Sequence, residues 1–175
     1  MKKEVPDYEN YPVSEEEMGK RYKNWTEGLA YQMMVLYRVG KETGGEKFVE
    51  RLKEEYFKMG KNSARLSMKL TGTTKEDYKD CSNLPKICDT FDDSMANFWN
   101  GYVENSAAAF EKDIITCPVV KSYSMEPDFC DVILGQFVKG VACEANPRFK
   151  TDGFSKLLVK GDSCCRYRIE LDKSK

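Results

Sequence analysis

Apolar residues in the first half of the chain recur every three or four positions, which is the spacing of one face of an α-helix. Ser14-Glu-Glu-Glu17 has the form of a capping box, so a first helix is expected to begin there and to end near Gly40. Its apolar positions are Trp25, Leu29, Met33, Leu36 and Tyr37. After a loop at residues 43–45, a second amphipathic helix is expected from Glu46 to Leu70. Because Met and aromatic side chains are usually buried, these stripes are predicted to form the core rather than a cofactor site.

The pattern becomes irregular after Thr71. Thr74 and Asp77 have the spacing that caps a short third helix, which Asn83-Leu-Pro85 would interrupt. The aspartates of residues 86–97 indicate a solvated helix or a loop. A calcium loop there would need a Gly and a later Glu at fixed offsets, and neither is present.

From Phe98 onward the pattern favours strands. Two are expected at Phe98–Val103 and Ala109–Cys117, followed by a helix at Asp128–Ala145. The turn signal Gly161-Asp162 then separates two further strands, Phe149–Val159 and Cys164–Leu171.

Side chains of the last expected strand alternate between two faces. The face predicted to point inward carries Cys165, Tyr167, Ile169 and Leu171. The face predicted to point outward carries Cys164, Arg166, Arg168 and Glu170. We therefore expect Cys165 near the core and Cys164 in solvent.

This order of elements predicts an α+β fold, in which N-terminal helices precede an antiparallel sheet interrupted by one helix. The expected organisation of residues 1–175 is a single domain. It comprises an irregular arm at residues 1–13, a mainly helical part at 14–97, and the sheet, helix and C-terminal hairpin at 98–175.

Composition narrows the classes of function. The net charge is −1 with both signs mixed, so the chain lacks the basic surface typical of nucleic-acid binding. No apolar run is long enough to span a bilayer, and the N-terminus lacks the apolar core of a signal peptide, so a cytoplasmic location is expected. The seven cysteines should then be reduced thiols. The absence of histidine excludes it as a general base or metal ligand.

The end of the predicted helix Asp128–Ala145 carries two reactive residue types. The apolar stripe of this helix comprises Cys130, Ile133, Leu134, Phe137 and Val141. Glu144 falls within this stripe, where desolvation would raise the pKa of its carboxyl group and suit it to acid–base catalysis. Alternatively, the helix frays before Glu144 and the carboxylate turns to water. Cys143 lies on the edge of the stripe, near the C-terminus of the helix, where the partial negative charge is unfavourable for a thiolate. The alternative to a nucleophilic Cys143 is therefore an inert, buried cysteine.

The C-terminal third also resembles a known family. The residues concerned are Cys143-Glu144, Asn146-Pro147, Leu157-Leu158 and the run from Gly161 to Tyr167, together with Cys117-Pro118 upstream. These segments resemble the signature of the L-2-amino-thiazoline-4-carboxylic acid hydrolase family.

The resemblance implies a cofactor-free hydrolase that opens a cyclic C–N or C–S bond of a small-molecule substrate. Catalysis would fall to Cys143, Glu144, Cys165 and Asp162, and substrate binding to Cys117 and Asn146. A base would activate water, or a thiolate would attack, while an acid protonates the leaving atom. For Asp162 the alternative is a turn-forming role, because Asp stabilises such bends.

Two other classes of function stay open. A small-molecule-binding or sensor module would have a pocket with apolar walls, whereas an enzyme needs titrating groups inside it. A metal held by Cys117, Cys143 and Cys165 is the third possibility, although zinc sites commonly use closely spaced pairs of cysteines. A monomer and a homo-oligomer are both compatible with the sequence.

Overall fold

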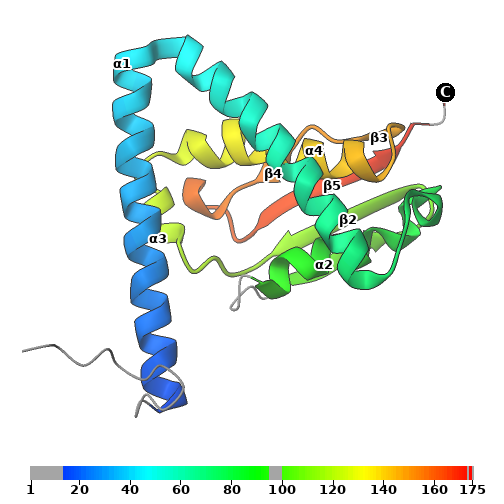
Figure 1. Cartoon of the computed structure of the whole chain (residues 1–175), viewed down its shortest axis with the longest axis horizontal. Helices are drawn as coiled ribbons and strands as arrows, with labels where there is room; N and C mark the ends of the chain where they lie inside the picture. The colour runs from blue at the N-terminus through cyan, green and yellow to red at the C-terminus, as the bar shows by residue number, and fades with distance from the viewer. Residues whose placement is uncertain (1–13, 95–99, 173, 175) are drawn as a thin grey trace, which may run out of the picture.

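The computed structural model describes residues 14–94, 100–172 and 174, and it has an α+β fold (Figure 1). The predicted arm at residues 1–13 lies outside the described residues. The α-helices are α1 (Glu15–Thr71), α2 (Leu84–Ser94), α3 (Val120–Tyr123) and α4 (Gly135–Ala145). The strands are β1 (Asn100–Asn105), β2 (Ala109–Ile114), β3 (Phe149–Lys150), β4 (Phe154–Lys156) and β5 (Cys165–Leu171). None of the described helices is both long and apolar enough to cross a membrane.

The two helices expected at the N-terminus form one element, α1, which bends sharply at Gly45. Its φ of 56° and ψ of −146° break the helix inside the predicted loop. The predicted helix start is confirmed, since Ser14 is the N-cap and its Oγ accepts a hydrogen bond from the Glu17 N–H at 3.2 Å. The Glu17 carboxylate pairs with Arg21 Nε at 2.9 Å. The predicted end at Gly40 is wrong, because the helix continues and the Phe48 ring packs directly against Gly40. The first half of α1 therefore extends to the bend, and the second half returns toward the sheet (Figure 1).

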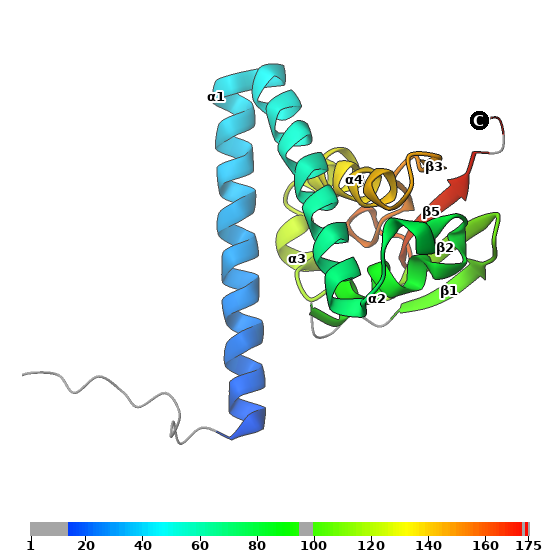
Figure 2. The ribbon, with the colours of Figure 1, turned by 45° about the vertical axis from the view of Figure 1, so that its right-hand side comes forward.

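The apolar stripe predicted to form the core of the first half of α1 is mostly exposed, so this prediction is wrong. Trp25 is 62% and Leu36 70% exposed. Tyr37 is the member of the predicted stripe that is buried, at 3% exposure, and Ala30 and Met34 are buried beside it. This half of the helix has apolar side chains on two sides, and the body of the protein covers only one of them (Figure 2).

The second half of α1 crosses α4 with the two backbones in direct contact. A Cβ atom added to Gly60 would lie 2.1 Å from the Phe137 carbonyl oxygen, and one added to Gly140 would lie 2.1 Å from that of Phe57. Only glycine fits at either position. This contact holds α4 against α1 while its other side packs on the sheet.

The shorter elements between the helix and the sheet partly follow the predictions. The expected capping box at Thr74 and Asp77 is present, and it opens a 3-10 turn, η2 (Lys75–Tyr78). A second 3-10 turn, η3 (Cys81–Asn83), leads into α2, which shows that residues 86–94 of the ambiguous region are helical. Residues 95–97 lie outside the described residues. A π-helical turn, η4 (Phe129–Leu134), precedes α4, so the helix expected at Asp128–Ala145 changes its winding midway.

The sheet is antiparallel, with the order β1-β2-β5-β3 and with β4 also paired to β5. The predicted last strand is confirmed as β5, and Tyr167 and Ile169 are buried as expected. The predicted strand Phe149–Val159 is instead divided into β3, β4 and a 3-10 turn, η5 (Leu158–Lys160), with Gly153 at a φ of 94° between the two strands. The outward placement of Cys164 is wrong, since it is buried in the bend before β5, where strand alternation does not apply.

Candidate functional site

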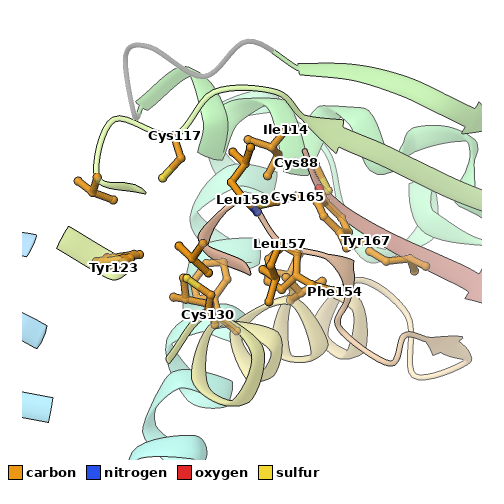
Figure 3. A pocket seen from close by; sticks show the side chains of 17 residues that line it. Cys88, Ile114, Cys117, Tyr123, Cys130, Phe154, Leu157, Leu158, Cys165 and Tyr167 are labelled. Atoms are coloured by element: carbon orange, nitrogen blue, oxygen red, sulfur yellow. The ribbon is translucent and has the colours of Figure 1, made fainter. Parts of the chain in front are cut away.

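An apolar cavity of about 200 Å³ lies between the sheet, α4 and the segments that join them (Figure 3). Its wall comes from 17 residues on separate parts of the chain. They are Cys88, Ile114, Cys117, Val119, Tyr123, Cys130, Leu134, Phe137, Val138, Val141, Phe154, Leu157, Leu158, Val159, Cys165, Tyr167 and Ile169. Among these lining residues none is charged, so the cavity suits an apolar ligand.

The loop before β5 builds one wall of the cavity. Gly161 adopts a φ of 93°, which ends the turn η5 and presents Leu157 and Leu158 to the cavity. Asp162 Oδ2 accepts a hydrogen bond from the Leu157 N–H at 2.7 Å and closes this loop. The neighbouring Arg166 donates two hydrogen bonds to Asp113. The contact of the Asp162 carboxylate is thus with the backbone of the wall.

Four of the seven cysteines line the cavity: Cys88, Cys117, Cys130 and Cys165. Cys117 and Cys130 come from opposite sides of it (Figure 3). The Cys165 thiol, placed inward as predicted, accepts a hydrogen bond from the Leu158 N–H at 3.3 Å.

Burial keeps the thiols of Cys117, Cys130 and Cys165 protonated. It raises the pKa of Cys117 to about 11, and it also raises the pKa values of Cys130 and Cys165. The neighbouring thiols add to the shift at Cys117 and Cys130. None of these three groups is therefore an activated thiolate at neutral pH. Among the described residues, no cluster of three Cys, Asp or Glu side chains is arranged to hold a metal ion.

Cys143 and Glu144 are not among the residues that line the cavity. Glu144 is 4% exposed and is held on the side of α4 that faces α1. Its carboxylate accepts two hydrogen bonds from Arg65, at 2.9 and 3.0 Å, and lies 2.8 Å from Lys75 Nζ. Lys61 Nζ lies 3.7 Å away.

The environment of Glu144 reverses the shift predicted from the sequence. The hydrogen bond from Arg65, with help from Lys75, lowers the pKa of Glu144 to about 2, although burial alone would raise it. The prediction of a raised pKa is therefore wrong. The alternative that the helix frays is also wrong, because α4 extends to Ala145 and the carboxylate is buried.

Asn146, predicted to bind substrate, caps α4. Its side-chain amide donates to the Tyr78 carbonyl oxygen at 2.8 Å and accepts from the Arg148 N–H at 2.9 Å. Of the six candidate site residues, only Cys117 and Cys165 line the cavity. Sequence reasoning did not select Cys130, Phe137 and Val141 as site residues, although their shared stripe on one helix marked a common apolar face. No sequence signal pointed to Cys88 or Tyr123.

No protein-family model matches the chain, and no curated protein matches it. Among solved structures, the chain is similar to the crystal structure of a trafficking protein particle complex subunit 3 from Naegleria fowleri covalently bound to palmitic acid. The TM-score is 0.61 and the sequence identity 14%, and the match covers 85% of this chain and 96% of that chain. At this identity the similarity shows a shared fold alone.

Proposed function

We propose that this protein binds a long apolar ligand, such as the acyl chain of a fatty acid, in the cavity between α4 and the sheet. The observation that carries the proposal is the lining of the cavity, which contains aliphatic, aromatic and thiol groups and no charged side chain among its described residues. Such a wall favours the transfer of a hydrocarbon chain from water. The structural neighbour, which is covalently bound to palmitic acid, supports the same class of ligand.

The lining also predicts that a charged head group is not required for binding. Since none of the residues in the wall is a cation, a fatty acid gains nothing from its carboxylate inside the cavity. The head group should then remain at the mouth of the cavity, in water. We expect hexadecanol to bind about as tightly as palmitic acid.

A direct test is binding of palmitic acid to the purified full chain, measured by displacement of a fluorescent fatty acid. The variant Leu158→Trp should fill the cavity and abolish displacement, because Leu158 lines the wall. Lys156→Trp is the matched control, since this nearby residue is exposed and does not line the cavity. Unchanged binding in Leu158→Trp, or no binding to the wild-type protein, would overturn the proposal.

The thiols suggest that the ligand is held without a covalent bond at neutral pH. A thioester would form if a cavity thiolate attacked palmitoyl-CoA and CoA left as its thiol. The raised pKa values of Cys117, Cys130 and Cys165 oppose this step near pH 7. Intact mass spectrometry after incubation with palmitoyl-CoA should show little acylation at pH 7, increasing toward pH 10.

One observation favours a second candidate function, the hydrolase activity implied by the family resemblance. Two of the residues named for it, Cys117 and Cys165, line the same cavity. This candidate would need a base in the cavity, and its carboxylates Glu144 and Asp162 are engaged with Arg65 and with the Leu157 N–H. Incubation with 2-amino-thiazoline-4-carboxylate, followed by assay for N-carbamoyl-cysteine, tests it. Product that disappears in Cys165→Ser would support a hydrolase.

A further inference from the structure

The outer face of the first half of α1 has the residue spacing of a coiled coil. Seven positions alternate in steps of four and three along the helix, and all seven are exposed. They are Met18, Tyr22, Trp25, Leu29, Gln32, Leu36 and Val39, which we term the outer seam. Six of the seven are apolar, and their exposed fractions run from 44% at Leu29 to 70% at Leu36. A stripe this long is more than the isolated exposed apolar residues of an ordinary surface.

The opposite face of the same helix is fixed to the body of the protein. Tyr37 and Met34 pack against Phe129, and the Tyr37 and Phe129 rings make an edge-on contact at 5.1 Å between centroids. Arg38 and Lys41 each pair with Glu126, at 2.5 and 2.9 Å. These contacts set the rotation of the helix and direct the outer seam away from the body, with no other described element covering it (Figure 2).

The residues beside the outer seam determine which partner helix it suits, because these flanking positions control the choice and direction of partners in coiled coils. They are Gly19, Arg21, Thr26, Gly28, Met33, Val35, Gly40 and Glu42. Only Arg21 and Glu42 are charged, and they have opposite signs. A Cβ atom added to Gly28 would meet nothing within 4 Å, so a second helix can approach closely there.

We propose that two copies of this chain associate through their outer seams as an antiparallel pair of helices. When Leu29 faces Gln32 of the second copy, Trp25 faces Leu36, and apolar side chains meet on both sides of the centre. The same register places Arg21 opposite Glu42 at each end, so the charged flanks attract. In a parallel pair Arg21 would face the uncharged Thr26, and this charge complementarity would be lost.

The test is sedimentation equilibrium of the full chain across the micromolar range. The wild-type protein should be a dimer, and Leu36→Glu should raise its dissociation constant by about a hundredfold or more. Because Leu36 is 70% exposed, this substitution should leave the fold intact, as circular dichroism would show. Leu70→Glu is the control, since Leu70 is 66% exposed on the other half of α1 and should not affect association. A monomeric wild type, or equal effects of both variants, would overturn the proposal.

A charge reversal tests the direction of the two helices. Arg21→Glu should weaken the dimer by placing like charges together, and the double variant Arg21→Glu/Glu42→Arg should restore it. A parallel pair predicts no rescue. Failure of the double variant to recover the wild-type dissociation constant would therefore rule out the antiparallel arrangement.

Discussion

On the side of α4 that faces the sheet, Phe137 and Val141 line a cavity without charge, whereas on the side that faces α1, Glu144 is surrounded by cations. The cavity keeps its thiols neutral, and the cluster around Glu144 keeps a carboxylate ionised. Residues assigned from the sequence to one helical stripe thus lie in two environments with opposite electrostatics. The cavity can hold a ligand, while the cluster, with Arg65, Lys61 and Lys75, connects α4 to α1 and η2.

The close contact between α4 and α1 positions both the cavity and the cluster around Glu144. Disruption of this contact is therefore expected to cause the largest loss of stability. In Gly140→Ala the new methyl group would collide with the Phe57 carbonyl oxygen, and the free energy of unfolding should fall by about 3 kcal/mol. Urea denaturation measures the loss. Gly101→Ala is the control, because its methyl group meets open space in β1 and should be neutral or stabilising. Equal stability of the two variants would show that the helices can separate at little cost.

The reactivity of the thiols tests the cavity side. Since burial raises the pKa of Cys117 from 9.0 to about 11, its thiolate population at neutral pH should be about a hundredfold below that of an ordinary thiol. Iodoacetamide labelling, followed residue by residue with mass spectrometry, should be slow at Cys117, Cys130 and Cys165. Palmitic acid should slow it further at these residues but not at Cys143, which is partly exposed and does not line the cavity.

Rapid labelling of Cys165 at neutral pH would contradict this picture. It would mean that the cavity contains an activated thiolate despite the burial of its thiols. The two sides of α4 would then no longer differ in their capacity for charge, and the hydrolase candidate would gain support.

The charged side is tested by Glu144→Gln, which keeps the shape of the side chain but removes its charge. The free energy of unfolding at pH 7 should fall by about 2 kcal/mol, because charge-assisted hydrogen bonds from Arg65 are weakened. Fatty-acid binding should not change. Glu50→Gln, at an exposed helix position, should stay within about 0.5 kcal/mol of the wild type. If Glu144→Gln lost ligand binding, the cluster around Glu144 and the cavity would have to be parts of a single binding site.

The pH dependence of the free energy of unfolding shows whether the charge of Glu144 stabilises the fold. The folded-state pKa of about 2 lies below that of the unfolded chain, so the ionised carboxylate stabilises the fold above the unfolded-state pKa. This contribution is lost as the pH falls toward 2. The difference in stability between the wild type and Glu144→Gln should therefore shrink between about pH 4.5 and pH 2. A difference independent of pH would show that packing, not charge, is responsible.

Local patterns in the sequence predicted the α+β fold, the start of α1 after Ser14 and the strand Cys164–Leu171, which the structure contains as β5 from Cys165 onward. Each depends on residues within a few positions of one another. The environment of Glu144 did not follow from such patterns, because its partner Arg65 is 79 positions away in the chain. The same reason explains the error on α1. Apolar residues lie on two sides of this helix, and only tertiary contacts decide that Met34 rather than Leu36 is buried.

The cavity was only partly accessible to prediction from the sequence. The inward position of Cys165 followed from strand alternation, and the stripe that contains Cys130 and Val141 followed from helical spacing. These two predictions were not combined, because no local pattern shows that β5 and α4 face each other. The wall at Leu157 and Leu158 was also missed, since a continuous strand was expected where η5 interrupts the chain.

The smallest effect is expected at Asp162, whose carboxylate closes the loop that forms this wall. Asp162→Ala should lower the free energy of unfolding by about 1 kcal/mol, because the Leu157 N–H loses its acceptor. The wall should loosen, so the affinity for palmitic acid should fall severalfold, while Asp162→Asn, which keeps an acceptor oxygen, should retain most of it. The variant Asp152→Ala, at an exposed residue before Gly153, serves as the control. Chemistry that requires the Asp162 carboxylate predicts the reverse: Asp162→Asn would then lose activity as completely as Asp162→Ala, with ligand affinity unchanged.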